Sequence, residues 1–123
     1  MSETELVLPR RLALQMLHEA QIAGDEGIAG VVAARSGPDI FFVAPFAERL
    51  DRLLAQGSQQ GRHPWAVFRY RPGNDNAPVA ADFSERPELL RLDASLATKG
   101  VLQLRAWKFT DGRVVERPMH IED

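Results

Sequence analysis

The chain contains no cysteine, which excludes disulfide bonds, thiolate nucleophiles and zinc sites built from cysteine. Neither sign of charge dominates, and a net charge of -2 provides no general attraction to nucleic acid or to an anionic membrane. No apolar run approaches the roughly 20 residues of a membrane-spanning helix. The acidic start Met-Ser-Glu-Thr-Glu lacks the basic and then apolar layout of a signal peptide. We therefore expect a cytoplasmic protein.

The composition that remains is ordinary for a globular protein, with 45% hydrophobic and 26% charged residues. A chain of 123 residues is long enough for one hydrophobic core. We see no repeat, low-complexity segment or linker, so residues 1–123 are predicted to form a single domain.

Apolar periodicity predicts alternating helices and strands. Residues 8–22 have helical spacing, and Gly24 is suited to end that helix. A hairpin over residues 27–43, a second helix over 46–56 and a strand from Trp65 follow. Alternation over 90–96 and the Asp111-Gly112 turn predict further hairpins, after one helical turn over 83–88. The expected core consists of Leu12, Phe41, Trp65, Val67, Phe68, Leu92, Leu96, Leu102 and Leu104.

Each histidine has a structural interpretation. His18 lies near the edge of a helix stripe with no second ligand type at helical spacing, and His63 is expected in a solvated loop before the third strand. His120 is expected in a frayed tail. None of the three is predicted to bind a metal.

The stretch from Trp65 to Asp82 begins as an apolar strand and ends in a loop rich in Pro, Gly, Asn and Asp. Loops of this kind carry many binding and catalytic sites. Side chains two residues apart share one face of a strand. One face is therefore expected to carry Trp65, Val67, Arg69 and Arg71.

This stretch resembles the signature of the JAB/MPN (JAMM, Mov34) zinc peptidases, which reads His-x-His-Pro, six residues, Ser, two residues, Asp. Here the register reads Arg69-Tyr70-Arg71-Pro72, six residues, Val79, two residues, Asp82. The proline and the aspartate match. Arginine replaces both histidine ligands, and valine replaces the serine.

The family's catalytic glutamate, in a Glu-x-x-Gly context, aligns with Gly27 when Gly30 is matched. Glu26 lies one residue out of register, which sends a strand side chain to the opposite face. A local slip that restores Glu26 remains open. The resemblance covers nearly the whole chain and implies a mixed α/β single domain, a central mixed sheet flanked by helices, of the cytidine deaminase-like type.

The replacements predict that the family's chemistry is absent. A zinc ligand needs a lone pair, and a guanidinium group has five donors and no acceptor. Hydrolysis by the family's route also needs a metal-polarised water and a glutamate to move its proton. We expect no cofactor, no metal and no peptidase activity.

The two arginines have a structural and a functional interpretation. In the first, Arg69 or Arg71 pairs with Asp82, with Asp75 or Glu26 as further acids. In the second, one arginine binds the terminal carboxylate of a ubiquitin-like or sulfur-carrier tail that ends in Gly-Gly, as the family's usual partners suggest.

Two other classes of function remain. A scaffold or oligomerisation subunit would pair with a JAB/MPN paralogue or with itself, and predicts an exposed apolar helix face around Leu14 and Ile22. Phosphate or nucleic-acid binding by Arg62, Arg69 and Arg71 lacks a surrounding basic surface and stacking aromatic residues. Neither nucleic acid nor membrane is an expected partner.

Overall fold

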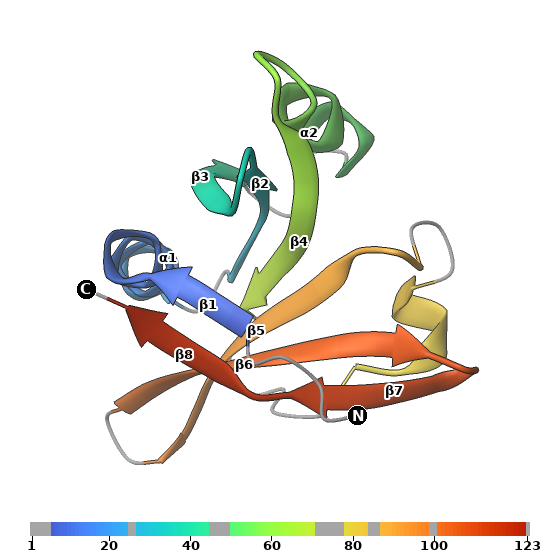
Figure 1. Cartoon of the computed structure of the whole chain (residues 1–123). Helices are drawn as coiled ribbons and strands as arrows, with labels where there is room; N and C mark the ends of the chain where they lie inside the picture. Colours follow the sequence, from blue (N-terminus) through green and yellow to red (C-terminus); the bar gives the residue numbers. More distant parts are fainter. Residues whose placement is uncertain are drawn as a thin grey trace.

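The computed structural model describes residues 6–24, 27–44, 50–70, 78–83, 87–98 and 101–122. Figure 1 shows the chain, whose elements are, in order, β1 (Leu6–Pro9), α1 (Arg10–Ala23), β2 (Ile28–Ala34), β3 (Pro38–Ala44), α2 (Leu50–Gly57), β4 (His63–Tyr70), η2 (Ala80–Phe83), β5 (Leu90–Thr98), β6 (Val101–Thr110), β7 (Arg113–Arg117) and β8 (Met119–Glu122). No helix in these ranges is long and apolar enough to cross a membrane.

A six-stranded sheet in the order β3-β2-β4-β5-β6-β7 forms the centre of the fold. β4 and β5 run parallel, and the other neighbouring pairs run antiparallel. The sheet is therefore mixed, and the helices pack against it in one domain. The predicted mixed α/β fold is confirmed.

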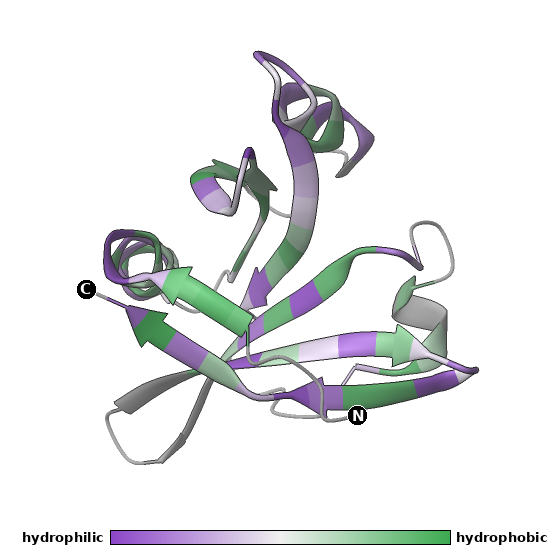
Figure 2. Ribbon diagram, in the orientation of Figure 1, coloured by the Kyte–Doolittle hydropathy of each residue, from purple (hydrophilic) through white to green (hydrophobic). Residues whose placement is uncertain are grey.

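The two helices cover opposite faces of the sheet. Leu12 and Met16 of α1 are completely buried and pack in one cluster with Val32 and Phe68. Leu53 and Leu54 of α2 pack with Val31 and Val67, whose neighbours along the strands point to the first cluster. Figure 2 shows hydrophobic residues along β1 and on α2, with hydrophilic residues on the outer side of α1.

The ends of the described chain form a second, two-stranded sheet that the pattern analysis missed. β1 and β8 pair in parallel, with Leu6 opposite Met119 and Leu8 opposite Ile121. Leu8 is fully buried in the main cluster. The expected helix start at Leu8 was wrong because Pro9, with φ -59° and ψ 139°, is still extended and caps α1. The frayed tail expected around His120 was also wrong, although the His120 side chain is exposed.

Most of the other predicted elements are confirmed. The β2–β3 hairpin, the strands β5 and β6 and the turn between β6 and β7 lie where the pattern placed them. Asp111 and Gly112 have φ of 52° and 75°, as a two-residue hairpin turn requires. Helix α2 begins at Leu50, and residues 45–49 lie outside the described residues. The helical turn predicted over 83–88 includes residues 84–86, which lie outside the described residues; the structure describes a short 3-10 helix, η2, that ends at Phe83.

A β-bulge in β4 corrects the predicted face of Trp65. Val32 pairs with Ala66, but the next residue, Ala33, pairs with Pro64, so Trp65 is an extra residue. The bulge turns Trp65 toward the cluster of α1, whereas Val67 points to the cluster of α2. His63 was expected in a loop but is the first residue of β4, where it pairs with Ala34.

The predicted core is confirmed for Leu12, Phe41, Val67, Phe68 and Leu92. Trp65 and Leu104 are partly buried against it. The side chains of Leu96 and Leu102 lie outside the described residues.

Candidate ligand-binding face

Strand register brings charged residues together on the face of the sheet that α2 only partly covers. Arg69 of β4 lies opposite Asp93 of β5, and Asp93 lies opposite Arg105 of β6. Two residues along, Arg91 lies opposite Trp107, which lies opposite Glu116 of β7. Residues two apart share a face, so these rows extend the face of Val67. We call this surface the arginine-rich face, comprising Arg69, Arg91, Asp93, Arg105, Trp107 and Glu116.

Arg69 and Asp93 form the most enclosed pair on this face. Their closest atoms, Nη2 and Oδ2, are 3.9 Å apart, and the side chains are 15% and 16% exposed. The distance is long for a direct hydrogen bond but close for an ion pair. Low exposure reduces screening by water, so Asp93 stabilises the charge of Arg69 more than a surface carboxylate would.

The outer part of the face is more open. Arg105 Nε lies 3.5 Å from Glu116 Oε2, with side chains 52% and 47% exposed. The Arg105 guanidinium also lies 6.0 Å from the centre of the Trp107 ring. Trp107 Nε1 is buried and has no hydrogen-bond partner among the described residues. Leaving a buried N–H donor without an acceptor costs free energy.

Aromatic contacts attach η2 to this face. Phe83, the last residue of η2, is buried and stacks on Phe109 of β6, with ring centres 5.7 Å apart. The Arg91 guanidinium lies 5.8 Å from the centre of the Phe83 ring. In Figure 1, η2 lies beside β6 and β7, on the opposite side of the molecule from α1. The backbone of Asp82, one residue before Phe83, is thereby placed near the arginine-rich face.

The structure separates two of the predicted site residues. Arg69 is on the arginine-rich face, whereas Tyr70 is buried in the cluster of α1 on the opposite face. Gly27 lies immediately before β2 with φ 69°, a conformation that favours glycine. A glutamate at this position would have to adopt the same uncommon backbone conformation.

The remaining predicted residues are only partly described. Val79 is described, and its side chain is 60% exposed. The Asp82 backbone belongs to η2, but its side chain, together with Glu26, Asp75, Arg71 and Pro72, lies outside the described residues. The expected partner of Arg69 or Arg71 was Asp82, whose side chain is not described; among the described residues, Asp93 lies beside Arg69.

Comparison with solved structures identifies the fold. A protein from Desulfitobacterium hafniense (DSY2949) has a TM-score of 0.76 at 16% identity, over 96% of this chain and 93% of that one. A Salinibacter ruber protein has a TM-score of 0.64 at 17% identity, over 96% and 92%. A JAB1/MPN domain protein from Archaeoglobus fulgidus (AF2198) has a TM-score of 0.63 at 14% identity, over 95% and 99%. The fold is of the JAB/MPN type.

Sequence comparison adds no closer relative. No protein-family model matches the chain, and no curated protein matches it. The JAB/MPN relationship therefore rests on the fold, which extends over nearly the full length of both chains.

The residues that the structure describes do not fit the zinc site of the JAB/MPN signature. Arg69, at the first histidine position, has no lone pair and carries a permanent charge that repels a cation. The Arg69 guanidinium lies beside the carboxylate of Asp93 and forms an ion pair with it. Within the described ranges, no three His, Cys, Asp or Glu side chains lie close enough to hold a metal ion.

Five residues of the arginine-rich face were missed from the sequence: Arg91, Asp93, Arg105, Trp107 and Glu116. The pattern placed Asp93 on the polar side of a half-buried strand but gave it no partner. Alternation indicates which side of a strand is polar, whereas the neighbour across the sheet depends on the parallel pairing of β4 and β5. That pairing connects segments that are distant in the sequence, so no local signal specifies it.

Proposed function

We propose that this protein is a catalytically inactive JAB/MPN-like domain that acts as a protein-binding module in the cytoplasm. The observation that carries the proposal is the Arg69–Asp93 ion pair at the first ligand position of the signature. A guanidinium group at that position cannot coordinate zinc, and without a metal-polarised water the family's hydrolysis has no nucleophile. The fold is retained while the chemistry is replaced.

The partner we propose is the C-terminal tail of a ubiquitin-like or sulfur-carrier protein. A terminal carboxylate would be bound by the guanidinium of Arg69 or Arg71 through two parallel hydrogen bonds. Arg105 is half exposed on the same face. Its guanidinium can donate to the carbonyl groups of an extended tail.

The test is a calorimetric titration with two peptides of the same sequence ending in Gly-Gly, one as the free acid and one as the amide. We expect the free acid to bind at least about tenfold more tightly, because only it offers a charged acceptor. Arg69→Ala, Arg71→Ala and Arg105→Ala should each weaken binding. Equal affinity for the two peptides would contradict the proposal.

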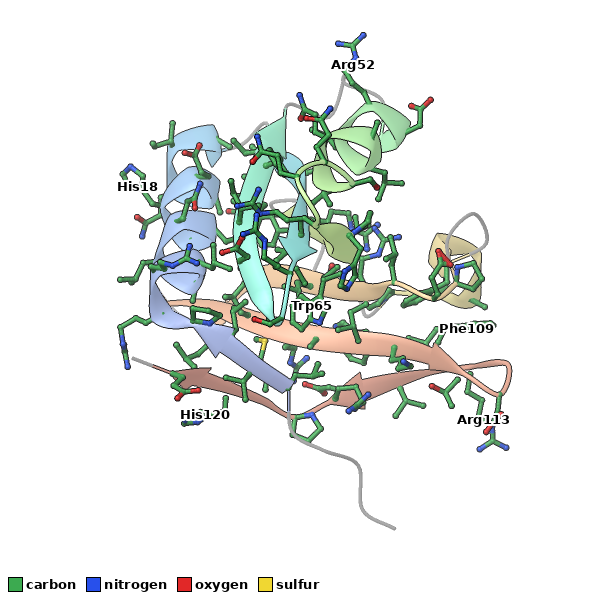
Figure 3. All side chains as sticks on the ribbon, turned by 45° about the horizontal axis from the view of Figure 1, so that its top comes forward. His18, Arg52, Trp65, Phe109, Arg113 and His120 are labelled. Carbon is green, nitrogen blue, oxygen red and sulfur yellow. The ribbon has the colours of Figure 1, made fainter. Side chains whose placement is uncertain are left out.

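Arg113→Ala is the matched control. This exposed arginine lies at the tip of the β6–β7 hairpin, as Figure 3 shows, whereas Arg69 lies on β4, two strands away from β6 in the sheet. It should leave the affinity unchanged. Circular dichroism of each variant separates loss of binding from loss of fold. A ubiquitin-like fusion substrate should stay intact with and without added zinc.

A second candidate function, a scaffold that pairs through α1, is favoured by one observation. Leu14 and Ile22 of α1 are 57% and 66% exposed. A shallow apolar groove of about 280 Å³ adjoins Leu14, between α1 and the strands β6 and β8. Exposed apolar side chains beside an apolar groove often mark a contact surface.

Light scattering tests this candidate. If α1 pairs with a second copy, the mass should increase with concentration, and Leu14→Gln with Ile22→Gln should keep the protein monomeric. A strict monomer at high concentration would remove self-association and leave pairing with a JAB/MPN paralogue as the form to test by co-purification.

A further inference from the structure

A second cluster of arginines lies at the other end of β4, remote from the arginine-rich face. Arg62 directly precedes β4, and Arg69 lies near the end of that strand. Because a strand rises about 3.3 Å per residue, the two residues are roughly 20 Å apart. The sequence-based grouping of Arg62 with Arg69 and Arg71 is therefore wrong for Arg62. Its neighbours are instead Arg11 of α1, and Arg35 of the β2–β3 turn.

The cluster is organised around Asp39 of β3. Arg62 Nε donates to Asp39 Oδ2 at 2.6 Å, and Arg11 Nη2 donates to the backbone carbonyl of Asp39 at 2.6 Å. Arg11 Nη2 also lies 3.5 Å from Asp39 Oδ1. One aspartate thus holds two guanidinium groups, from segments far apart in sequence.

Gln60 extends the cluster to a third arginine. Arg62 Nη1 donates to Gln60 Oε1 at 3.0 Å, and Arg35 Nη2 donates to the Gln60 backbone carbonyl at 2.8 Å. Arg62 therefore shares Asp39 with Arg11 and Gln60 with Arg35, each arginine using different oxygen atoms. We call Arg11, Arg35, Asp39, Gln60 and Arg62 the Asp39 cluster.

The charges of the Asp39 cluster do not balance. Three guanidinium groups surround one carboxylate, which leaves a local charge of about +2 in a chain whose net charge is -2. The excess is therefore local and does not reflect general basicity. The Arg11 side chain is 61% exposed, and Arg35 is also exposed. Each guanidinium has five N–H donors, of which the bonds within the cluster use only some.

We propose that the Asp39 cluster binds a phosphate dianion, either inorganic phosphate or the terminal group of a small phosphomonoester. Asp39 already neutralises one arginine, so the remaining charge matches a dianion. Hydrogen bonds to Asp39 and Gln60 hold the guanidinium groups in place before the ligand arrives, which lowers the entropic cost of ordering them. Tetrahedral oxyanions accept the paired N–H groups that arginine offers.

The first test is a calorimetric titration of the full chain with inorganic phosphate, with sodium chloride at the same ionic strength as the reference. Saturable binding of one phosphate per chain is expected, and its absence would overturn the proposal. A parallel titration with glycerol phosphate identifies the source of the group. Tighter binding of the ester points to a phosphomonoester, and tighter binding of phosphate points to the free ion.

Variants separate a site from nonspecific attraction. Arg35→Gln removes one exposed guanidinium and one surface hydrogen bond, so it should fold and bind phosphate about tenfold more weakly. Arg113→Gln removes the same charge from the far hairpin and should bind as the unmodified chain does. Equal losses in the two variants would overturn the proposal, since they would show attraction by net charge alone.

For one further variant, the direction of the change in phosphate affinity separates a binding site from a purely structural cluster. Asp39→Asn removes the competing carboxylate but keeps an oxygen for Arg62, so phosphate should bind several-fold more tightly. If the cluster only ties α1 and β4 to β3, this variant gains no affinity for phosphate. That result would count against the site.

Discussion

Arg69 and Asp93 face each other across the parallel strands β4 and β5, with Nη2 and Oδ2 3.9 Å apart and about 15% of each side chain exposed. In the JAB/MPN signature, the position of Arg69 is a histidine that binds zinc. An ion pair within the sheet thus occupies a position from which a metal would be held. Either an ion pair or a bound metal at this position can stabilise the fold. Only a histidine there could hold a zinc ion, which acts as a Lewis acid.

We expect the purified protein to contain substoichiometric zinc. Arg69 offers no lone pair and its positive charge repels the ion. Metal analysis by mass spectrometry measures the content, before and after dialysis against zinc. A chelator should leave the melting temperature unchanged if, as we expect, no metal contributes to folding. Stoichiometric zinc that a chelator removes, with a fall in melting temperature, would contradict this prediction.

Removing one partner of the Arg69–Asp93 pair should destabilise the protein. Asp93→Asn removes the carboxylate that lies beside the poorly hydrated Arg69, and we expect a loss of about 2 kcal/mol, between the values for exposed and buried pairs. Urea denaturation of Asp93→Asn, Arg69→Gln and the double variant gives the coupling energy. Arg105→Gln is the control, because its pair with Glu116 is about half exposed and should contribute less than about 1 kcal/mol. A coupling energy near zero would show that the 3.9 Å contact is not an effective ion pair.

Gly30→Ala should be strongly destabilising. A Cβ atom at Gly30 would lie 2.5 Å from the carbonyl oxygen of Phe42 and 2.7 Å from Cζ of Phe41. Phe41 cannot move easily, because it packs edge-to-face on Phe68 with ring centres 5.5 Å apart. We expect a loss of about 3 kcal/mol in the free energy of unfolding.

Gly37→Ala is the control for Gly30→Ala. Nothing lies within 4 Å of a Cβ atom built at Gly37, in the β2–β3 turn. Its free energy of unfolding should stay within about 0.5 kcal/mol of the unmodified chain. Similar losses in the two variants would show that the close approach of Phe41 is not the cause.

The stability of the protein should depend on Asp39 in acid. The hydrogen bond from Arg62, with the charges of Arg62, Arg35 and Arg11, lowers the pKa of Asp39 below its usual 3.8. A carboxyl whose pKa is lower in the folded state stabilises the fold above its unfolded pKa, and this contribution is lost as pH falls through the folded value. Melting temperatures of the unmodified chain and of Asp39→Asn should therefore differ by a constant amount above pH 3.8 and converge below it. Curves that stay parallel at low pH would contradict the prediction.

The elements that were predicted correctly are those that depend on residues close together in the sequence. The buried stripe of α1, its end at Gly24, the β2–β3 hairpin and the Asp111-Gly112 turn were predicted, since each depends on residues a few positions apart. The strand β1 was missed because four residues before a helix give no periodic signal. Its pairing with β8 joins the two ends of the described chain.

Part of the candidate site was also predicted. Arg69 was identified as a permanent cation at a ligand position, because the chemistry of a side chain does not depend on the fold. Tyr70 was assigned to the site by its place in the motif, but it points into the opposite core. Trp65 was assigned to the face of Val67, and a single extra residue in β4 reversed it.

The order of residues by itself determined which groups can donate or accept electron pairs, and where short helices, strands and turns form. Only the tertiary structure decided that Asp93 is the acid beside Arg69, and that Arg11, Arg35 and Arg62 meet at Asp39. The physical reason is that strand register and helix docking are selected by burial of the whole core. Contacts between distant charged residues follow from that selection and have no signal of their own along the chain.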